Sequence, residues 1–438
     1  MTTNTLSLRR LARFWLPLQA TWLMMAVEGP FLALIIARLA EPMLNLAAFG
    51  VAYALAIVAE APVIMMMSAS TALVDCRPAY RALRRFAHTL SVAITVGMVV
   101  SLVTPTLSWV MGDLMDLDAA VVQLTHRAMW LLLPFPAAIG YRRFYQGLLI
   151  RAGLTRRVTW GTVVRLISMA TAAGLSVLAN LDGILVGAVA LSCGVVAEAI
   201  ASRIMARQVL RDLPVASPGA DPADLSWHGL WRFYWPLALT STIALAAQPV
   251  VTFFMGHARA PLESLAALPV LNGLVFIFRT PALSYQEVAI ATLSEDRRHL
   301  PQVLRFAGLL AGGATLLLAL VAWTPLSRVW FETVSGLSPE LAAYTRVPLR
   351  VLAIMPALSV LLNLERALMV HGRHTGPVTM ASVLEVTGIA SSLAVGVMLL
   401  DGVGVTVAAV AYMVGRLAAN LGLLGPVRGV INAKAPRA

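Results

Sequence analysis

Charged residues are scarce in this chain, and their scarcity defines its class. Only 12% of the 438 residues are Asp, Glu, Lys or Arg, whereas 59% are hydrophobic and the mean hydropathy is +0.81. A soluble domain has about twice this charged fraction. The composition therefore excludes an ordinary soluble protein and predicts an all-α membrane protein with many transmembrane helices.

Lysine, cysteine and nucleotide-binding motifs are also rare or missing. Lys434 is the single lysine, so nearly all basic residues are arginine. The two cysteines, Cys76 and Cys193, are too far apart in sequence to suggest a disulfide framework or a metal site. The sequence has no glycine-rich phosphate loop and no HExxH pattern, which argues against an ATP-driven pump and against an enzyme. We expect no cofactor, only a coupling ion, H⁺ or Na⁺.

Twelve apolar segments are long enough to cross a bilayer. They lie at about 12–36, 44–67, 87–110, 122–147, 158–179, 183–206, 230–255, 265–292, 303–327, 340–369, 377–399 and 403–428. Arginines gather in alternate connections, whereas the intervening connections are acidic or nearly bare. By the positive-inside rule, both termini lie in the cytoplasm. The net charge of +12 therefore indicates orientation in an inner (plasma) membrane rather than a nucleic-acid partner.

The two halves of the sequence repeat. Arg13-Phe14 matches Arg232-Phe233, and Arg85-Phe86 matches Arg305-Phe306 at almost the same separation along the chain. An even number of spans per half predicts two lobes of the same orientation, related by an axis along the membrane normal. We predict an N-terminal lobe (1–211, six spans), a cytoplasmic linker (212–228) and a C-terminal lobe (229–438, six spans) in a monomer.

Charges of opposite sign occupy matching positions in the two halves. Glu60 aligns with Arg279, and Arg165 aligns with Glu385. A charge near the middle of a span costs roughly 2.5–3.5 kcal/mol on insertion scales, so such residues rarely face lipid. The two-lobe organisation resembles an exporter superfamily, named below, and this resemblance implies that the second and eighth spans meet at the lobe interface. On that basis we predict that Glu60 and Arg279 approach each other across a central cleft. The pair would be either a structural ion pair between the lobes or a gate that also contacts substrate.

Further intramembrane charges complete the candidate site. Together with Arg165 and Arg279, the side chains of Arg143 and Arg366 would form a cationic cavity if they face the cleft. Arginine forks suit carboxylates and phosphates, although each of these side chains could instead extend to the membrane surface. Glu28 and Glu198 are candidates for the coupling ion. The alternative is that each carboxylate is already paired with an arginine.

The two-lobe organisation resembles the multidrug/oligosaccharidyl-lipid/polysaccharide (MOP) exporter superfamily, which includes MATE transporters. Shorter segments resemble the progressive ankylosis (ANK) transporter family: Arg13–Leu18, Gly50–Leu55, Arg232–Leu239 and Val347–Arg350. The superfamily resemblance implies a secondary exporter that works by rocking of two lobes. The ANK resemblance implies small organic or phosphate-bearing anions, such as citrate, ATP or pyrophosphate. The MATE resemblance implies cationic drugs exchanged for protons or sodium ions.

The number of deep arginines favours an exporter of a small anion whose partners are that substrate and the lipid bilayer. The first alternative is a multidrug exporter of organic cations. The second is a flippase for lipid-linked sugars, which a lateral opening lined with arginine and a long apolar groove would favour.

Overall fold

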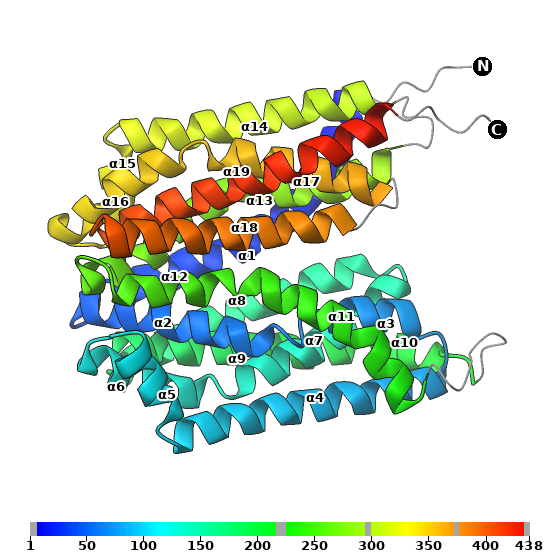
Figure 1. The fold of residues 1–438 in the computed structure, drawn as a ribbon. Coiled ribbons are helices and arrows are strands. Elements are labelled where there is room, and N and C mark those ends of the chain that lie inside the picture. The colour runs from blue at the N-terminus through cyan, green and yellow to red at the C-terminus, as the bar shows by residue number, and fades with distance from the viewer. Residues whose placement is uncertain (1–6, 216–224, 294–298, 372–375, 433–438) are drawn as a thin grey trace. The chain divides into compact units, whose positions relative to one another are not determined.

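Every named element in the described chain is a helix (Figure 1). The computed structural model describes residues 7–215, 225–293, 299–371 and 376–432. Within these ranges β-structure is limited to one isolated bridge, between Arg259 and Val403. The predicted all-α fold is confirmed. The centre of the predicted linker and Lys434 lie outside the described residues.

The helices follow a similar order in both halves. Up to residue 212 they are α1 (Leu8–Ile36), α2 (Pro42–Glu60), α3 (Met66–Leu73), α4 (Arg77–Val103), α5 (Thr106–Trp109), η1 (Val110–Leu114), α6 (Ala119–Leu131), α7 (Pro134–Arg151), α8 (Thr155–Leu178), α9 (Gly183–Met205) and α10 (Arg207–Asp212). After the linker they are α11 (Trp227–Leu245), α12 (Ala247–Gly256), α13 (Pro261–Thr292), α14 (Leu300–Trp323), α15 (Leu326–Arg328), η2 (Val329–Val334), α16 (Pro339–Leu352), α17 (Met355–His371), α18 (Gly376–Ala394), η3 (Val395–Leu399) and α19 (Gly404–Asn432). The halves differ in that the second span is broken in the first half (α2, α3) and the first span is divided in the second half (α11, α12).

Most predicted spans coincide with a helix long and apolar enough to cross a membrane. Among the described residues there are ten such helices, or eleven if α16 and α17, bent by 44°, form one span. The predicted span at 122–147 falls on α6 and α7 and does not reach this standard. Helix α6 has only 13 residues, and α7 has three arginines in 18 residues: Arg142, Arg143 and Arg151.

The backbone repeats as the sequence does. Glu41 and Ala260 occupy matching positions, and both adopt left-handed backbone, with φ of 47° and 54°, directly before the prolines that start α2 and α13. Asp116 and Gly336 also match in the repeat and are left-handed at φ of 51° and 75°. Both follow a π-helical turn, η1 or η2. The two halves therefore share turns as well as helices.

Two compact units make up the chain, and each takes the first span of the other half of the sequence: α1 in one unit, α11 and most of α12 in the other. The C-terminal unit comprises Met1–Arg38 and Phe254–Ala438, and the N-terminal unit comprises Leu39–Phe253. Within the first, α1 packs against α13; within the second, α11 packs against α2 and α4. The units differ from the predicted lobes, 1–211 and 229–438, by this exchange of the first span of each half.

Specific contacts hold α1 on α13. A Cβ on Gly273 would lie 2.9 Å from Cγ of Pro30, so the glycine lets the two helices approach closely at this point. Further along, Gln19 Nε2 donates to Thr280 Oγ1 at 2.9 Å, and Ser284 Oγ donates to Gln19 Oε1 at 2.8 Å. Polar side chains commonly join helices in this way where the surroundings are apolar.

The second predicted span is interrupted. Helix α2 ends at Glu60 and α3 begins at Met66, with Pro62 between them. Two hydroxyls of α11 satisfy freed carbonyls of the break: Ser241 Oγ donates to Ala61 O at 2.8 Å, and Tyr234 Oη donates to Pro62 O at 2.6 Å. Irregular backbone at membrane depth requires such partners. The matching Pro281 lies inside the continuous helix α13.

Candidate functional site

Glu198 of α9 is the centre of a buried polar cluster in the N-terminal unit. Its Oε2 accepts a hydrogen bond from Arg142 Nη1 and lies 3.8 Å from Arg165 Nη1. Its Oε1 accepts from Gln146 Nε2 at 3.1 Å. Arg142 and Gln146 stand one turn apart on α7 and therefore face the same way. One carboxylate, 1% exposed, thus joins two guanidinium groups. The sequence made Glu198 a candidate for the coupling ion, with pairing to an arginine as the alternative. In the structure its carboxylate is paired with arginines.

Glu60 adds a second carboxylate at the point where span 2 breaks. A negative charge at the last residue of α2 is unfavourable, because a helix C-terminus carries partial negative charge. The charges of Arg142, Arg143 and Arg165 act on Glu60 in the opposite sense. Arg143 also contacts Met67, with Nη1 3.8 Å from Sδ. We call these residues the N-terminal cluster: Glu60, Arg142, Arg143, Arg165 and Glu198.

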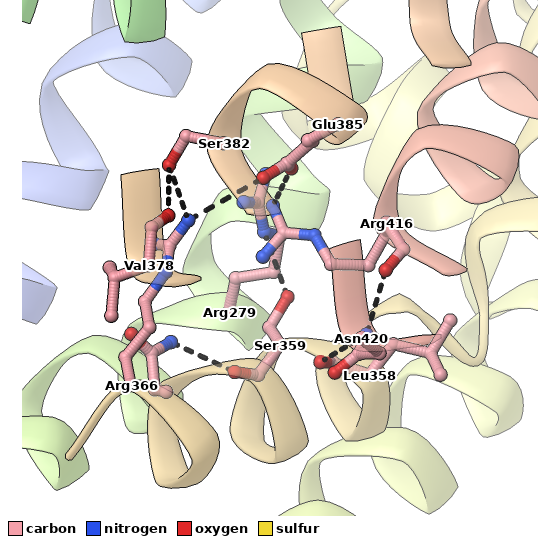
Figure 2. Close-up of polar contacts among 10 residues, drawn as sticks. Arg279, Leu358, Ser359, Arg366, Val378, Ser382, Glu385, Arg416 and Asn420 are labelled. Atoms are coloured by element: carbon pink, nitrogen blue, oxygen red, sulfur yellow. Dashed lines mark hydrogen bonds and ion pairs between the residues drawn. The ribbon is translucent and has the colours of Figure 1, made fainter. Parts of the chain in front are cut away.

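A second cluster lies in the C-terminal unit around Glu385 of α18 (Figure 2). Arg416 Nη2 is 2.8 Å from Glu385 Oε1, and Arg366 Nη2 is 3.7 Å from Oε2. Arg366 also donates to Ser382 Oγ at 3.3 Å. As with Glu198, a single carboxylate joins two guanidinium groups, here from α17 and α19.

Arg279 brings a further positive charge to the same place. Its Nε donates to Ser359 Oγ at 3.3 Å, and it lies within electrostatic range of Arg366, Glu385 and Arg416. Figure 2 shows Arg279 beside these side chains. The C-terminal cluster therefore comprises Arg279, Arg366, Glu385 and Arg416, and the buried carboxylate of Glu365 also acts on Arg366.

Close helix packing fixes the position of the Glu385–Arg416 pair. A Cβ on Gly415 would lie 2.6 Å from the carbonyl oxygen of Glu385 and 2.6 Å from Cγ1 of Ile389. A Cβ on Gly388 would lie 3.1 Å from Cα of Gly415. These glycines bring α18 and α19 into near backbone contact, so the pair is held by short, rigid segments.

The two clusters occupy equivalent positions in the repeat but differ in charge. Both draw on the second, fourth, fifth and sixth spans of their half of the sequence, and the Glu60/Arg279 and Arg165/Glu385 positions are inverted in sign. Even so, arginine outnumbers glutamate in both clusters, three to two in each when Glu365 beside Arg366 is counted. Among the described residues, each cluster therefore has one more arginine than carboxylate.

The structure places all the predicted site residues in helices and adds two that the prediction had left out. Arg142 and Arg416 make the shortest ion pairs of the two clusters. In the sequence, Arg142 and Gln146 are four residues apart and therefore face the same way on a helix, and this spacing could have identified Arg142 as a site residue. Glu28, the other coupling-ion candidate, is buried in α1. Its role stays a prediction, and so does the approach of Glu60 to Arg279, which belong to different units.

The described ranges contain no group of three or more His, Cys, Asp or Glu residues that could hold a metal ion. What the clusters offer instead is guanidinium and amide donors, which suit an anion.

Solved transporter structures share this fold over nearly the whole chain. An inward-facing multidrug resistance MATE family transporter of the MOP superfamily matches with a TM-score of 0.68 at 14% identity, covering 97% of this chain and 100% of its own. The lipid II flippase MurJ, in an inward closed conformation, matches with a TM-score of 0.74 at 13% identity, covering 94% and 87%. A MOP superfamily transporter from Pyrococcus furiosus, whose reversed binding-pocket polarity suggests a different function, matches with a TM-score of 0.64 at 14% identity, covering 99% and 100%.

These likenesses show that the chain has the fold of MATE-like transporters. No family model and no curated protein matches the sequence. The resemblance of its short segments to the ANK family stays a prediction.

Proposed function

We propose that this protein is a secondary active transporter of the MOP superfamily that exports a small organic or phosphate-bearing anion across the inner membrane by alternating access. The supporting observation is the excess of arginine over glutamate in both buried clusters. A guanidinium group presents a planar fork of donors that matches carboxylate and phosphate oxygens. Such forks inside transmembrane helices are costly unless an anion or a carboxylate balances them.

Glu198 and Glu385 would act as internal counter-ions in this proposal. Each neutralises part of its arginine cluster while no substrate is bound, and a substrate anion would compete for the same guanidinium groups. Gln146 and Ser359 already donate or accept hydrogen bonds within the clusters. They are positioned to adjust when an arginine changes partner. Binding and release would then exchange one set of charge-assisted bonds for another of similar strength.

The descriptions of the structural neighbours are compatible with either a positively or a negatively charged substrate. A MATE relative is described as a multidrug transporter, while the Pyrococcus furiosus transporter is described by a reversed pocket polarity. An organic cation would have to bind beside three arginines in each cluster here, which is electrostatically unfavourable. The charge balance therefore favours the anion over the predicted alternative of organic-cation efflux.

Uptake into proteoliposomes tests the substrate class. The purified protein is reconstituted and supplied with radiolabelled citrate or pyrophosphate, and in parallel with a labelled organic cation. We expect saturable anion flux, and we expect Arg279→Gln to weaken apparent affinity about tenfold through loss of a charged donor. Arg305→Gln, an exposed arginine of α14 in the same unit, is the control and should leave flux unchanged. Cation flux without anion flux would overturn the proposal.

A second candidate, translocation of lipid-linked sugars, is favoured by one observation. A groove of about 450 Å³ lies between α18 and α19, lined mainly by apolar residues that include Val395, Leu400, Val407 and Val410. The exposed side chains of Val395, Leu400 and Val410 are suited to contact with lipid. Flipping of a fluorescent polyprenyl-phosphate lipid in the same proteoliposomes, lost on Val410→Trp, would favour this candidate over the soluble anion.

A further inference from the structure

A third group of polar side chains lies outside both clusters, where α4, α7 and α9 meet in the N-terminal unit. Arg203 Nη1 donates to Tyr145 Oη at 2.6 Å, and Arg84 Nη1 donates to Tyr80 Oη at 3.3 Å. The two tyrosine hydroxyls are 3.3 Å apart. The hydroxyl pair thus links the two guanidinium groups, and we call this group the Arg84–Arg203 cluster.

Aromatic rings hold both guanidinium groups in place. Arg84 Cζ lies 5.4 Å from the centre of the Tyr80 ring, and Arg203 Cζ lies 5.6 Å from that of Tyr145. Tyr145 is fully buried, and Tyr141 packs edge-on against it at 4.8 Å. Cation–π contact with fixed rings restricts the rotamers of the arginines, so the donors are arranged before any ligand arrives.

The contacts within the described residues do not use all the N–H donors of Arg84, and they leave both arginines without an acidic partner. Over the part of the chain that the structure describes, neither forms an ion pair with an acidic residue. The buried Nε of Arg84 has no hydrogen-bond partner there. Both guanidinium groups also act electrostatically on His88, one turn from Arg84 on α4. Positive charges gathered without a carboxylate repel one another, and an anion would relieve that repulsion.

The surroundings place the cluster at the depth of lipid headgroups. Phe86, two residues from Arg84, packs against Trp227 and Trp231 with ring centres 5.1 and 6.3 Å apart, and both tryptophans are exposed. Exposed tryptophans mark the interface between lipid and water. Beside Arg203, the exposed side chains of Ile200 and Ile204 continue along α9 as an apolar surface suited to acyl chains.

The repeat shows that the fold itself does not require this cluster. In the second half of the sequence, the positions that match Tyr80, Arg84 and His88 are taken by Leu300, Leu304 and Gly308. The same helix therefore packs in the other half without any of these polar groups. A role other than structural support explains why they occur in only one half.

We propose that the Arg84–Arg203 cluster binds the phosphate of an anionic phospholipid headgroup. The guanidinium groups of α4 and α9 supply charge-assisted hydrogen bonds to the phosphate oxygens, and the acyl chains lie along Ile200 and Ile204. The bound lipid joins two helices that the polar contacts already bring together through Tyr80 and Tyr145. This site is separate from the substrate clusters and does not depend on the identity of the transported molecule.

Thermal unfolding of the full chain in detergent tests the site. The midpoint is titrated with short-chain phosphatidylglycerol, with short-chain phosphatidylcholine and with inorganic phosphate. We expect a saturable rise with phosphatidylglycerol only. Arg84→Gln and Arg203→Gln should each raise the half-saturating concentration about tenfold, because each removes a charged donor. Arg84→Lys, which keeps the charge but loses the fork, should fall between wild type and Arg84→Gln.

Arg85→Gln is the matched control, because Arg85 is the exposed neighbour on the same helix and has the same charge. It should titrate as wild type does. An equal rise in midpoint for the Arg84→Gln/Arg203→Gln double variant and for wild type would overturn the site. An equal rise with phosphatidylcholine, or with inorganic phosphate alone, would overturn the anionic lipid as its ligand.

Discussion

At the scale of single residues, Glu198 shows how a buried carboxylate is kept inside a transmembrane bundle. It is held by Arg142, Arg165 and Gln146, so its negative charge is divided among three donors. Removing one partner of a buried ion pair leaves the other charge uncompensated. We therefore expect Arg142→Gln to lower the free energy of unfolding by about 3 kcal/mol. Chemical denaturation in detergent micelles measures this.

The control for this prediction is the double variant Arg142→Gln/Glu198→Gln. It replaces the Arg142–Glu198 ion pair by two amides. It should recover part of the lost stability, because the carboxylate is no longer charged, while Arg165 still loses its 3.8 Å contact with that carboxylate. Arg156→Gln, at an exposed position on α8, should unfold as wild type does. If Arg142→Gln also unfolded as wild type does, the pair would have no structural role.

The left-handed residue before α13 gives a second prediction at this scale. Ala260 has φ of 54°, a conformation in which a Cβ costs roughly 1–2 kcal/mol and glycine costs little. We expect Ala260→Gly to raise the free energy of unfolding by about 1 kcal/mol. Ala266→Gly, buried within α13, is the control and should lower it by a similar amount, since glycine weakens a helix interior.

At the scale of helices, the close approach of α18 and α19 sets the geometry of the C-terminal cluster. We expect Gly415→Ala to force the helices apart, because the new methyl would meet the carbonyl oxygen of Glu385 at 2.6 Å. Stability should fall by about 1–3 kcal/mol, and anion uptake should fall with it. Gly425→Ala on the same helix meets nothing within 4 Å and is the matched control. A Gly415→Ala protein with wild-type stability and uptake would contradict this.

Much of the helical pattern could be predicted from the sequence, but the way the helices group could not. Long apolar runs and repeated words such as Arg85-Phe86 locate spans and their register, because span length and side-chain depth are one-dimensional properties. The helix against which each span packs is not a one-dimensional property. Helices that are apolar on all sides give little sign of which face packs. Packing of α1 on α13 depends on the shape match of Pro30 with Gly273, which the sequence does not reveal.

The sequence could predict which residues form the candidate site, but not which arginine pairs with which carboxylate. All the predicted residues except Glu28 lie in the two clusters, because a charge inside an apolar run is visible in sequence. Which arginine pairs with which carboxylate depends on helix rotation and tilt. Glu198 thus aligns in the repeat with no charged residue, yet pairs with Arg142 on another helix.

At the scale of the whole molecule, the predicted approach of Glu60 to Arg279 would take part in the proposed transport cycle. If the predicted pair forms during transport, we expect Glu60→Gln and Arg279→Gln each to reduce uptake at least about tenfold, because each variant would remove one of its two charges. The exchanged variant, with Glu60→Arg and Arg279→Glu, should restore part of it. Flux into proteoliposomes measures all three. If uptake were unchanged in every variant, these two residues would not belong to the mechanism.

The helix exchange between the units also has a consequence for biosynthesis. The freed carbonyls of Ala61 and Pro62 receive their donors from Ser241 and Tyr234, which leave the ribosome much later. Likewise α1 enters the bilayer first but meets α13 only after most of the protein has been translated. The insertion machinery must therefore release half-built bundles whose final partners are still to come. A gene split at the linker should yield working protein only when both fragments are made in the same cell.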